Sequence, residues 1–410
     1  MDRSAVSRRD ALRTAAELVP VLKQRAARTE QLRRLPSETV QDLIASSLIR
    51  IGNPRRYGGT GLEVDVVYEI AWELGRGCGS TAWCYALWAI HNWWIGHFPE
   101  RAQDDLFATG PDTVFSSGLN PTRGKAEPVS GGFRVSGRWS FSSGSDVASW
   151  VMVATPGATR GSLMWHLLPR SDVEIVDTWF ASGMRGSGSN DVIVKDAFVP
   201  AYRAIDPNRA GDGEWTGWEL HQRLSYRIPL RAMTGWDLSA PVVGIAQGAV
   251  DEFTARVRES TTPGRTAESS ALQLRLAEAS AEVDAARALQ RHDVCELLDK
   301  AARGETPNET DRARYRRDKA YVARLCVQAV NRLFEGSGAR AVMDSEPIQR
   351  FHRDAHAASH HVALAWDVWA EQFGRQALGL TDMGGLAAGP PSPPLGAPRQ
   401  SRGAPRDTPG

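Results

Sequence analysis

The sequence predicts an α+β fold that is mostly α-helical, in which a β-rich region separates two helical ones. Apolar residues recur at helical spacing from about residue 5 to 110 and again from about 217 to 380. Between about 113 and 206, apolar and polar residues alternate with a period of two, broken by Gly and Pro. We therefore expect an N-terminal α-helical domain (1–112), a middle β-domain (113–210), a C-terminal helical bundle (211–383) and a tail (384–410).

Two apolar stripes and one continuous apolar segment predict the helices of the N-terminal domain. The stripes repeat every three or four residues, as in amphipathic helices, and consist of Ala11, Ala15, Leu18 and Leu22, then Val66, Val67, Ile70 and Leu74. Pro36-Ser37-Glu38 indicates a helix start between them. The segment STAWCYALWAIHNWWIGHF (80–98) is apolar nearly all round, which predicts a helix that is buried or lines a pocket.

Short strands separated by turn residues predict the middle domain. The string GGFRVSGRWSFSSG (131–144) alternates, and its period places Phe133, Val135, Trp139, Phe141 and Ser143 on one side of a strand. Residues 149–154 and 191–194 form further apolar strands.

Helical spacing returns in the last third of the chain. One stripe contains Leu276, Val283, Ala286, Leu289 and Val294, and another contains Val322, Leu325, Ala329, Val330 and Leu333. Two such long amphipathic helices indicate a bundle. The last 27 residues hold 6 Gly and 7 Pro, which predicts a disordered tail over 384–410.

Composition excludes several classes of function. Lys+Arg number 49 against 48 Asp+Glu, a balance that argues against a nucleic-acid-binding surface. No stretch approaches the roughly 18 apolar residues of a membrane helix, and the first residues lack the apolar core of a secretory signal, so we expect a cytoplasmic protein. The four cysteines show no CxxC spacing, so neither a zinc site nor a disulfide framework is predicted.

Three separated strings, in this order, carry a resemblance to a known family. They are GRWSFSSGSDVASW (137–150), DTWFASGMRGSGSNDVIVKDAFVP (177–200) and FEGSGARAVMDSEPIQRFHRDAHAASHHVAL (334–364). Together they resemble the acyl-CoA dehydrogenase fold, and within it the two-component, reduced-flavin-dependent monooxygenases. The resemblance covers roughly residues 10–380 and implies an N-terminal helical domain, a barrel-like middle β-domain and a C-terminal four-helix bundle.

One position separates the two branches of this fold. In the dehydrogenases that this chain resembles, a catalytic Glu often stands eight residues after the Asp of an Arg-Asp-Ala string. Here that string ends in Asp354-Ala355, and the eighth residue after Asp354 is Val362, which cannot act as a base. The monooxygenase branch carries a His at the seventh position, which is His361. The resemblance implies that His361 hydrogen-bonds a flavin C4a-hydroperoxide and handles a proton near neutral pH.

The resemblance also implies a set of flavin-binding residues. A Ser or Thr two places after an aromatic residue faces flavin N5 in this fold, and Ser143 after Phe141 fits that spacing, although a one-residue gap would select Ser142. Trp179 would lie beside the isoalloxazine and Ser189 near the flavin phosphate. Arg185 belongs to the same glycine-rich string, whose backbone N–H groups could meet phosphate. On the residues alone, strand-end serines and an ordinary loop remain the alternative.

The substrate pocket is expected along the apolar segment. His91 is polar on an otherwise apolar helix, and it is either a satisfied core histidine or a substrate contact. Branch members carry substrate-contacting residues in this part of the chain, so the resemblance implies His91, Trp94 and Ser117 as pocket residues. His91 would also serve a phenolic substrate as a base or hydrogen-bond acceptor.

Three further histidines are spaced four residues apart, which allows a metal stripe on a helix: His352, His356 and His360. The string lacks an HExxH motif and has only Asp354 as a nearby carboxylate, so we expect a surface stripe and no metal.

The resemblance as a whole implies a flavin-dependent monooxygenase that takes reduced FMN or FAD from a partner reductase and O2 as co-substrate. No GxGxxG string opens a helix after a strand, which agrees with reduction by another protein. The expected substrate is a phenol or polycyclic aromatic. The alternatives are N- or S-oxygenation, an acyl-CoA dehydrogenase with a relocated Glu, and a degenerate binding protein. The resemblance further implies a homotetramer, with Arg256, Arg258 or Arg265 as cross-subunit phosphate partners.

Overall fold

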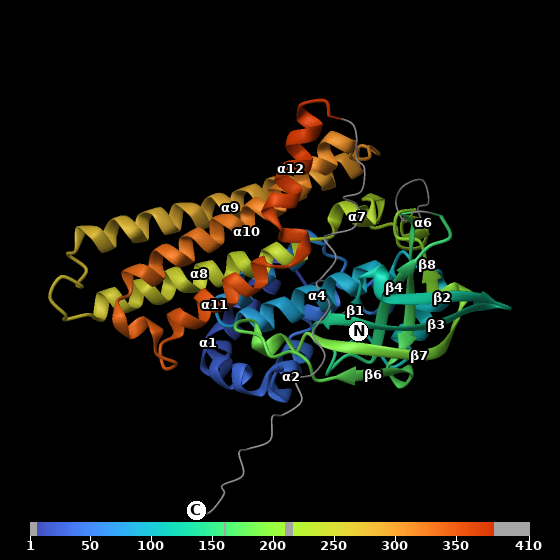
Figure 1. The fold of residues 1–410 in the computed structure, drawn as a ribbon, viewed down its shortest axis with the longest axis horizontal. Helices are drawn as coiled ribbons and strands as arrows, with labels where there is room; N and C mark the ends of the chain where they lie inside the picture. Colours follow the sequence, from blue (N-terminus) through green and yellow to red (C-terminus); the bar gives the residue numbers. More distant parts are fainter. Residues whose placement is uncertain (1–5, 160, 210–215, 381–410) are drawn as a thin grey trace, which may run out of the picture.

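The computed structural model describes residues 6–159, 161–209 and 216–380, so the predicted tail lies outside the described residues. Helices come first, strands second and helices again last (Figure 1). The N-terminal helices are α1 (Arg8–Leu32), α2 (Ser37–Ala45), α3 (Asp65–Gly75), α4 (Gly79–Ile95) and α5 (Glu100–Phe107). Ser7 caps α1 by accepting a hydrogen bond from the backbone N–H of Asp10, and α2 begins at Ser37 as its sequence indicates.

Helix α4 is the structural centre of the molecule. Every residue from Gly79 to Ile95 is buried, which confirms the buried helix predicted from the apolar segment. It packs against α3, against a long helix of the C-terminal bundle, α8 (Trp236–Glu259), and against the first strand, β1 (Phe115–Gly118). Side chains on α4 therefore face both the helical and the β part of the chain.

The strands form two four-stranded sheets. The remaining strands are β2 (Gly124–Val129), β3 (Gly132–Ser142), β4 (Trp150–Pro156), β5 (Leu163–Pro169), β6 (Val173–Val176), β7 (Asn190–Pro200) and β8 (Ala204–Ile205). One sheet has the order β1-β4-β5-β8 and the other β2-β3-β7-β6. Their shared apolar core includes Val135 and Trp139 of β3 and Val151 of β4.

The end of β3 departs from the predicted alternation. Its pairing with β7 shifts register between Trp139 and Ser142, and Phe141 adopts a left-handed backbone with φ at 69°. An extra residue in a strand turns the following side chain to the other face. Phe141 is consequently 65% exposed while Trp139 is buried, so the expectation that both share one side is wrong.

The C-terminal part consists of helices again. Besides α8, they are α6 (Thr216–His221), α7 (Leu230–Met233), α9 (Ser270–Ala302), α10 (Glu309–Gly336), α11 (Pro347–Ser359) and α12 (Trp366–Ala377). Helices α8 to α11 lie side by side, with α12 against one end of α10 (Figure 1). Both predicted stripes face the bundle core, with Val283 and Ala286 buried on α9 and Val322 and Leu333 buried on α10.

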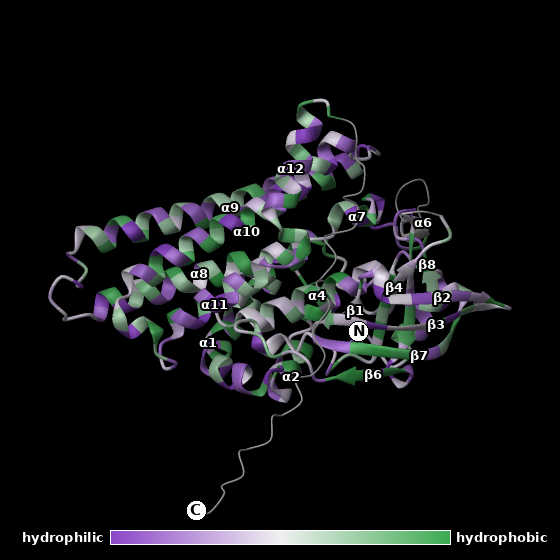
Figure 2. Ribbon diagram, viewed as in Figure 1, coloured by the Kyte–Doolittle hydropathy of each residue, from purple (hydrophilic) through white to green (hydrophobic). Residues whose placement is uncertain are grey.

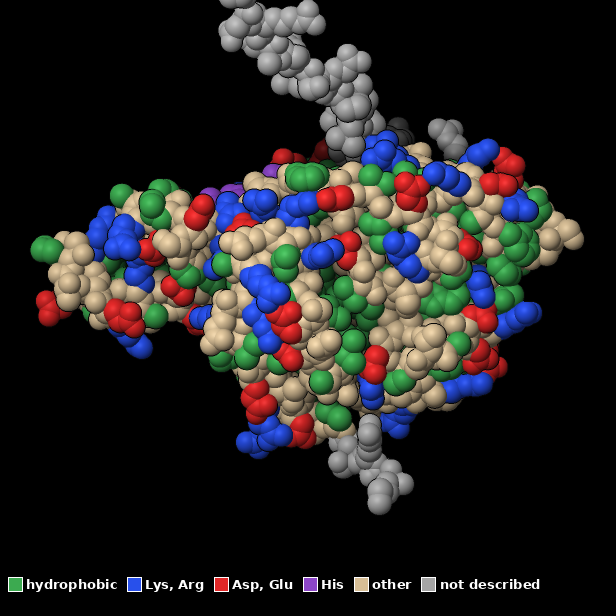
Figure 3. All heavy atoms as spheres, turned by 90° about the horizontal axis from the view of Figure 1, so that it is seen from below, with side chains coloured by type: hydrophobic (Ala, Val, Ile, Leu, Met, Phe, Trp, Pro, Cys, Tyr) green, Lys and Arg blue, Asp and Glu red, His purple; other side chains and the backbone are tan. Residues whose placement is uncertain are grey.

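The surface matches the balanced composition. Hydrophilic and hydrophobic residues alternate along the outer helices α9 and α10 (Figure 2). On the face shown in Figure 3, basic and acidic side chains are interspersed. Within the described ranges, no helix has both the length and the apolar character that a membrane span requires.

Candidate active site

Helix α4 presents two polar clusters, one at Trp83 and one at His91. The two residues are eight positions apart, which separates them by about 12 Å along the helix axis. Trp83 faces the ends of β3 and β7, and His91 faces β1. The sequence segment that was predicted to be buried thus carries side chains into both clusters.

The first cluster is a chain of serine hydroxyls. Ser143 Oγ lies 2.7 Å from Ser189 Oγ, which lies 2.7 Å from Ser187 Oγ, and all three side chains are buried. Trp83 Nε1 donates to Ser143 Oγ at 3.1 Å. Ser142 points elsewhere, because its hydroxyl donates to Ser116 Oγ of β1 at 2.9 Å. The structure therefore brings Ser143 and Ser189 together and leaves Ser142 outside this cluster.

Trp179 lies at the edge of the same cluster. Its Nε1 donates to the carbonyl of Met184 at 2.9 Å, and its backbone N–H donates to Asn190 Oδ1 at 3.2 Å. Its ring meets Phe141 edge-on, with centroids 6.1 Å apart. Phe141 is largely exposed and Trp179 is half-buried, so together they form an aromatic wall beside the serine hydroxyls.

Helix α11 anchors the loop that carries Trp179. Asp354 Oδ1 accepts a hydrogen bond from the Met184 backbone N–H at 2.6 Å, and Arg353 Nη1 donates to the Ser182 carbonyl at 2.6 Å. A Cβ at Gly183 would fall 2.0 Å from the Arg353 carbonyl, so only glycine fits there. Burial raises the pKa of Asp354 to about 6. The Arg353-Asp354 pair thus has a structural task in this chain, which is to hold the loop.

Arg185 is partly buried and incompletely satisfied. Among the described residues, its buried Nε meets no hydrogen-bond acceptor. A buried guanidinium N–H without an acceptor is unfavourable, and phosphate or carboxylate oxygens suit its geometry. This residue can therefore take an anionic group of a ligand.

His361 lies beside the first cluster, just after the end of a helix. Helix α11 ends at Ser359, and His361 has an extended backbone that starts a short 3₁₀ turn, η9 (Val362–Leu364). Its Nδ1 accepts the Ala363 backbone N–H at 3.1 Å, so the proton of the neutral ring resides on Nε2. The ring lies edge-on to Trp83, with centroids 6.0 Å apart.

The surroundings of His361 lower its pKa below the neutral range that the sequence led us to expect. Burial lowers the pKa of His361 to about 4, because the charged imidazolium loses its hydration. No carboxylate of the described chain forms an ion pair with it. His361 is therefore a neutral hydrogen-bond donor at physiological pH.

The three-histidine stripe is also less exposed than expected. His352 stacks on Phe334 of α10 with centroids 4.3 Å apart, and His356 Nε2 lies 2.7 Å from Asn331 Oδ1. Only His360 is exposed. Two of the three therefore pack α11 against α10, because α10 covers that face of the helix.

The second cluster surrounds His91. His91 Nδ1 lies 2.7 Å from the Phe115 carbonyl and Nε2 lies 3.2 Å from Ser117 Oγ. Because the carbonyl can only accept, Nδ1 carries the proton and Nε2 accepts the Ser117 hydroxyl. The Trp94 ring lies tilted against His91 and against Trp165, with centroids 4.7 Å and 4.9 Å apart. Its buried Nε1 has no acceptor in the described part of the chain.

Comparison with known proteins decides the family. The acyl-CoA dehydrogenase C-terminal domain matches residues 237–366. The oxygenase subunit HsaA, a flavin-dependent monooxygenase of Mycobacterium tuberculosis, is 36% identical and covers 92% of this chain and 98% of its own. The FADH2-dependent resorcinol hydroxylase, oxygenase component, of a Rhizobium species is 33% identical, and the match covers 90% of this chain and 94% of that protein.

Solved structures agree with this result. The 3-HSA hydroxylase of Rhodococcus sp. RHA1 superposes with a TM-score of 0.85, at 32% identity, covering 90% of this chain and 96% of that one. The chain belongs to the flavin-dependent monooxygenases, as an oxygenase component. The predicted fold class and family are therefore confirmed. The comparisons do not support the two alternatives, an acyl-CoA dehydrogenase and a non-enzymatic binding protein.

The first cluster of this monooxygenase fits a flavin. Its hydroxyl chain offers donors and acceptors to a polar ring edge, the Phe141–Trp179 wall offers an aromatic face, and Arg185 has an N–H without an acceptor. Trp83 and Ser187 belong to this cluster, although the sequence analysis did not select them. Trp83 could have been found from its spacing, since it precedes His91 by eight residues on the same apolar helix.

The three arginines proposed for cross-subunit contacts differ in their surroundings. Arg256 pairs with Glu346, and Arg265 Nη1 donates to the Gly336 carbonyl at 3.1 Å. Arg258 is exposed and has no ion pair within the described residues. Arg258 is thus the one of the three whose guanidinium is available to another subunit.

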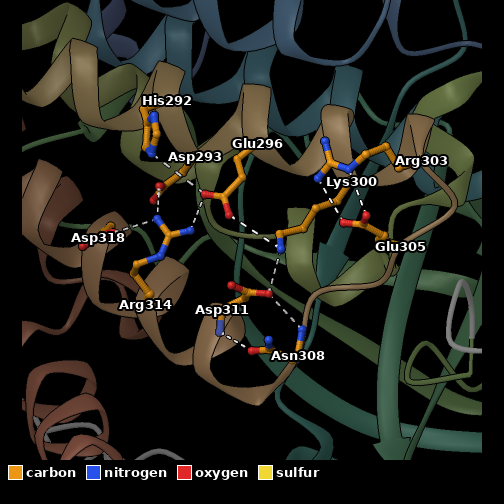
Figure 4. Close-up of polar contacts among 10 residues, drawn as sticks. All are labelled: His292, Asp293, Glu296, Lys300, Arg303, Glu305, Asn308, Asp311, Arg314 and Asp318. Carbon is orange, nitrogen blue, oxygen red and sulfur yellow. Dashed lines mark hydrogen bonds and ion pairs between the residues drawn. The ribbon is translucent and has the colours of Figure 1, made fainter.

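One cluster of the described chain has metal-ligand residue types, namely His292, Asp293 and Glu296 of α9. Arg314 of α10 reaches into it and pairs with both carboxylates (Figure 4). The guanidinium occupies carboxyl oxygens that a metal ion would need as ligands. This cluster is therefore an ion-pair network of the bundle and not a metal centre.

Proposed function

We propose that this monooxygenase hydroxylates a phenolic aromatic substrate, with reduced FMN or FAD supplied by a separate reductase. The observation that carries the proposal is the Ser117–His91–Phe115 hydrogen-bond chain beside the neighbouring rings of Trp94 and Trp165. It suits a molecule that brings a phenolic hydroxyl on an aromatic body. Resorcinol is the substrate in the name of one relative, and the term oxygenase component in that name implies a reductase.

The chemistry of oxygen activation belongs to the cofactor. Reduced flavin supplies the electrons with which O2 is split, so that one oxygen atom enters the substrate and the other leaves as water. The task of the chain is to bind the reactants, orient them and keep water out. Ser143, Ser189, Trp179 and Arg185 are the residues that would hold the flavin. Ser142, at the end of β3, would support them through its hydrogen bond to Ser116 of β1.

We assign His361 the role of a hydrogen-bond donor to the reacting oxygen. Its fixed tautomer presents Nε2–H, for which the described chain offers no acceptor. A neutral imidazole does not have to take up a proton at physiological pH before it can donate this hydrogen bond. His361 also stands where related dehydrogenases place their catalytic base.

Ser117 is the group that would meet the phenol. Its own hydroxyl hydrogen points to His91 Nε2, which leaves its oxygen free to accept the phenol O–H. Burial lowers the pKa of His91 to about 4, so His91 polarises this chain without removing the proton completely. This partial withdrawal makes the aromatic ring more electron-rich and easier to oxygenate.

We further propose a cytoplasmic homotetramer in which Arg258 contacts the flavin phosphate of a neighbouring subunit. The exposed and unpaired Arg258 side chain supports this assignment. Light scattering at micromolar concentration should give the mass of four chains, and a monomer would contradict it.

The function is tested with the purified full chain and chemically reduced flavin. Anaerobic titrations with reduced FMN and reduced FAD give the affinity for each, and rapid mixing with O2 and a panel of phenols, amines and thioethers gives product per O2 consumed. We expect hydroxylated phenols and no reduction of the flavin by NADH alone. Product from amines or thioethers alone would contradict the phenol assignment.

A further inference from the structure

A cavity of about 150 Å³ lies between α7, the first half of α10 and the chain after β8. Its polar lining comes from Asn208, Arg231, Arg312, Tyr315, Arg316 and Lys319. No carboxylate of the described chain lines it. The volume is well above the roughly 10–15 Å³ that a single water needs, so it can hold a group of several atoms.

Lys319 places a buried amino group at the cavity. Its side chain is only 3% exposed, and Nζ donates to the carbonyls of Ala232 at 3.0 Å and Thr234 at 2.6 Å. No carboxylate of the described residues lies within ion-pair distance of it. Burial, with Arg316 and Arg231 nearby, lowers the pKa of Lys319 to about 7, although the carboxylates of Asp237 and Asp293 oppose this.

Tyr315 and Arg316 add unsatisfied groups to the same wall. Tyr315 is 1% exposed, and its hydroxyl has no hydrogen-bond partner in the described chain. Arg316 has no carboxylate partner there either, and its guanidinium only stacks over Trp369 at 5.7 Å. Arg314, two residues earlier on the same helix, pairs with Asp293 and Glu296 (Figure 4). The helix thus pairs Arg314 with carboxylates on one side, whereas Arg316 and Lys319 at the cavity have no carboxylate partner among the described residues.

We propose that this cavity is an oxyanion-binding subsite, which takes a carboxylate or a phosphate group carried by a small molecule. Guanidinium groups bind the oxygens of either group with charge-assisted hydrogen bonds, and the Tyr315 hydroxyl donates a further one. An oxyanion would also relieve the repulsion among Arg231, Arg316 and Lys319.

The cavity borders the turn that carries His361. A Cβ at Gly235 would lie 3.1 Å from Lys319 Cδ and 3.8 Å from the Ala363 Cβ, so Lys319 and Ala363 pack on the same glycine. Ala363 is the residue whose N–H bonds to His361. An anionic substituent of the substrate could therefore be held next to the reaction site. This identification of the carrier rests on the proposed function, whereas anion binding itself does not.

The binding test uses sodium phosphate as the probe, with calorimetry on the full chain at low ionic strength. We expect phosphate to bind the wild type, and Arg316→Gln to raise the dissociation constant about tenfold or more. Arg324→Gln is the matched control, because Arg324 is on the same helix as Arg316, stacks over Trp366 of α12 and does not line the cavity. If Arg316→Gln does not fold, Arg231→Gln carries the comparison. Equal phosphate affinity in the wild type and the folded variants would overturn the proposal.

Two matched pairs of ligands identify the carrier. If the substrate carries the oxyanion, 4-hydroxybenzoate should bind about tenfold more tightly than phenol, and Arg316→Gln should remove this difference. If the flavin carries the oxyanion, FMN should bind about tenfold more tightly than riboflavin, and Arg316→Gln should remove this difference. Should neither pair differ, the cavity does not serve a carried oxyanion and the proposal fails. Failure of the wild type to hydroxylate phenols would contradict the proposed function and leave the phosphate result unchanged.

Discussion

His361 lies edge-on against Trp83, with ring centroids 6.0 Å apart, and Trp83 Nε1 donates to Ser143 Oγ. One indole ring thus connects a residue of the C-terminal part with the end of a β-strand, although 218 positions separate His361 from Ser143 in the sequence. Because Trp83 is on the fully buried α4, it cannot move without disturbing the core. The relative position of His361 and the serine hydroxyls is therefore fixed by packing.

We expect His361→Ala to uncouple oxygen consumption from hydroxylation. The loss of a positioned donor should lower product formation by about 10²–10⁴-fold, with hydrogen peroxide formed in place of product. Flavin affinity should change little, because the first cluster keeps its serines. The measurement is the ratio of product to peroxide at saturating reduced flavin.

His352→Ala is the control for this experiment. It removes a stacked imidazole from the neighbouring helix without touching Trp83, so it should lower the melting temperature but leave the product ratio unchanged. Since burial lowers the pKa of His361 to about 4, the wild-type ratio should be constant between pH 6 and 8. A step in the ratio near pH 6.5 would show that His361 titrates and would contradict the neutral-donor role.

Trp83→Phe should weaken flavin binding. The substitution keeps an aromatic ring against His361 but removes the N–H that orients Ser143, and a single neutral hydrogen bond contributes about 1 kcal/mol. We expect the dissociation constant for reduced flavin to rise about fivefold in an anaerobic titration. Trp88→Phe removes an indole N–H that meets no acceptor in the described residues, and it should leave the constant unchanged. The same increase in both variants would indicate a general packing defect.

Ser117→Ala should raise KM for the phenol more than it changes flavin affinity. The variant removes the proposed acceptor of the phenol O–H and leaves His91 Nε2 without a donor. Loss of this contact should raise KM by roughly tenfold. Ser116→Ala, whose hydroxyl bonds Ser142, tests the neighbouring position on β1. An unchanged KM in Ser117→Ala would exclude this serine as the substrate contact.

The sequence predicted what depends on local periodicity and on motif. The buried helix around His91, the strand before Ser143 and the two long bundle helices all follow from apolar spacing, and the family strings supplied the rest of the fold. It could not predict the bulge that exposes Phe141, because a register shift depends on the partner strand. It also could not show that His361 lies beyond the end of α11, in an extended backbone that starts η9. The cluster at Trp83 depends on contacts between segments far apart in sequence.

Asp293 should make stability depend on pH in a direction unusual for a carboxylate. It is fully buried on α9, and burial together with the nearby Asp318 raises the pKa of Asp293 well above its ordinary value (Figure 4). The native state then keeps a proton that the unfolded chain releases above about pH 4, so this contribution to stability decreases as the pH rises toward neutrality. Arg314 limits the effect without removing it, because Asp293 Oδ2 has no partner in the described chain.

Asp293→Asn should remove that dependence, because the amide imitates the protonated carboxyl and can still accept from Arg314. We expect equal stability of variant and wild type near pH 5, and a variant that is more stable by about 1 kcal/mol or more at pH 8. Urea unfolding at several pH values measures the free energy of unfolding of each protein. In the difference between variant and wild type, the contributions of the other titrating groups cancel. Asp299→Asn, at an exposed position of the same helix, should give no such trend. If Asp293→Asn were instead less stable at pH 8 than at pH 5 relative to the wild type, Asp293 would be ionised in the native state and its pairing with Arg314 would be the stronger influence.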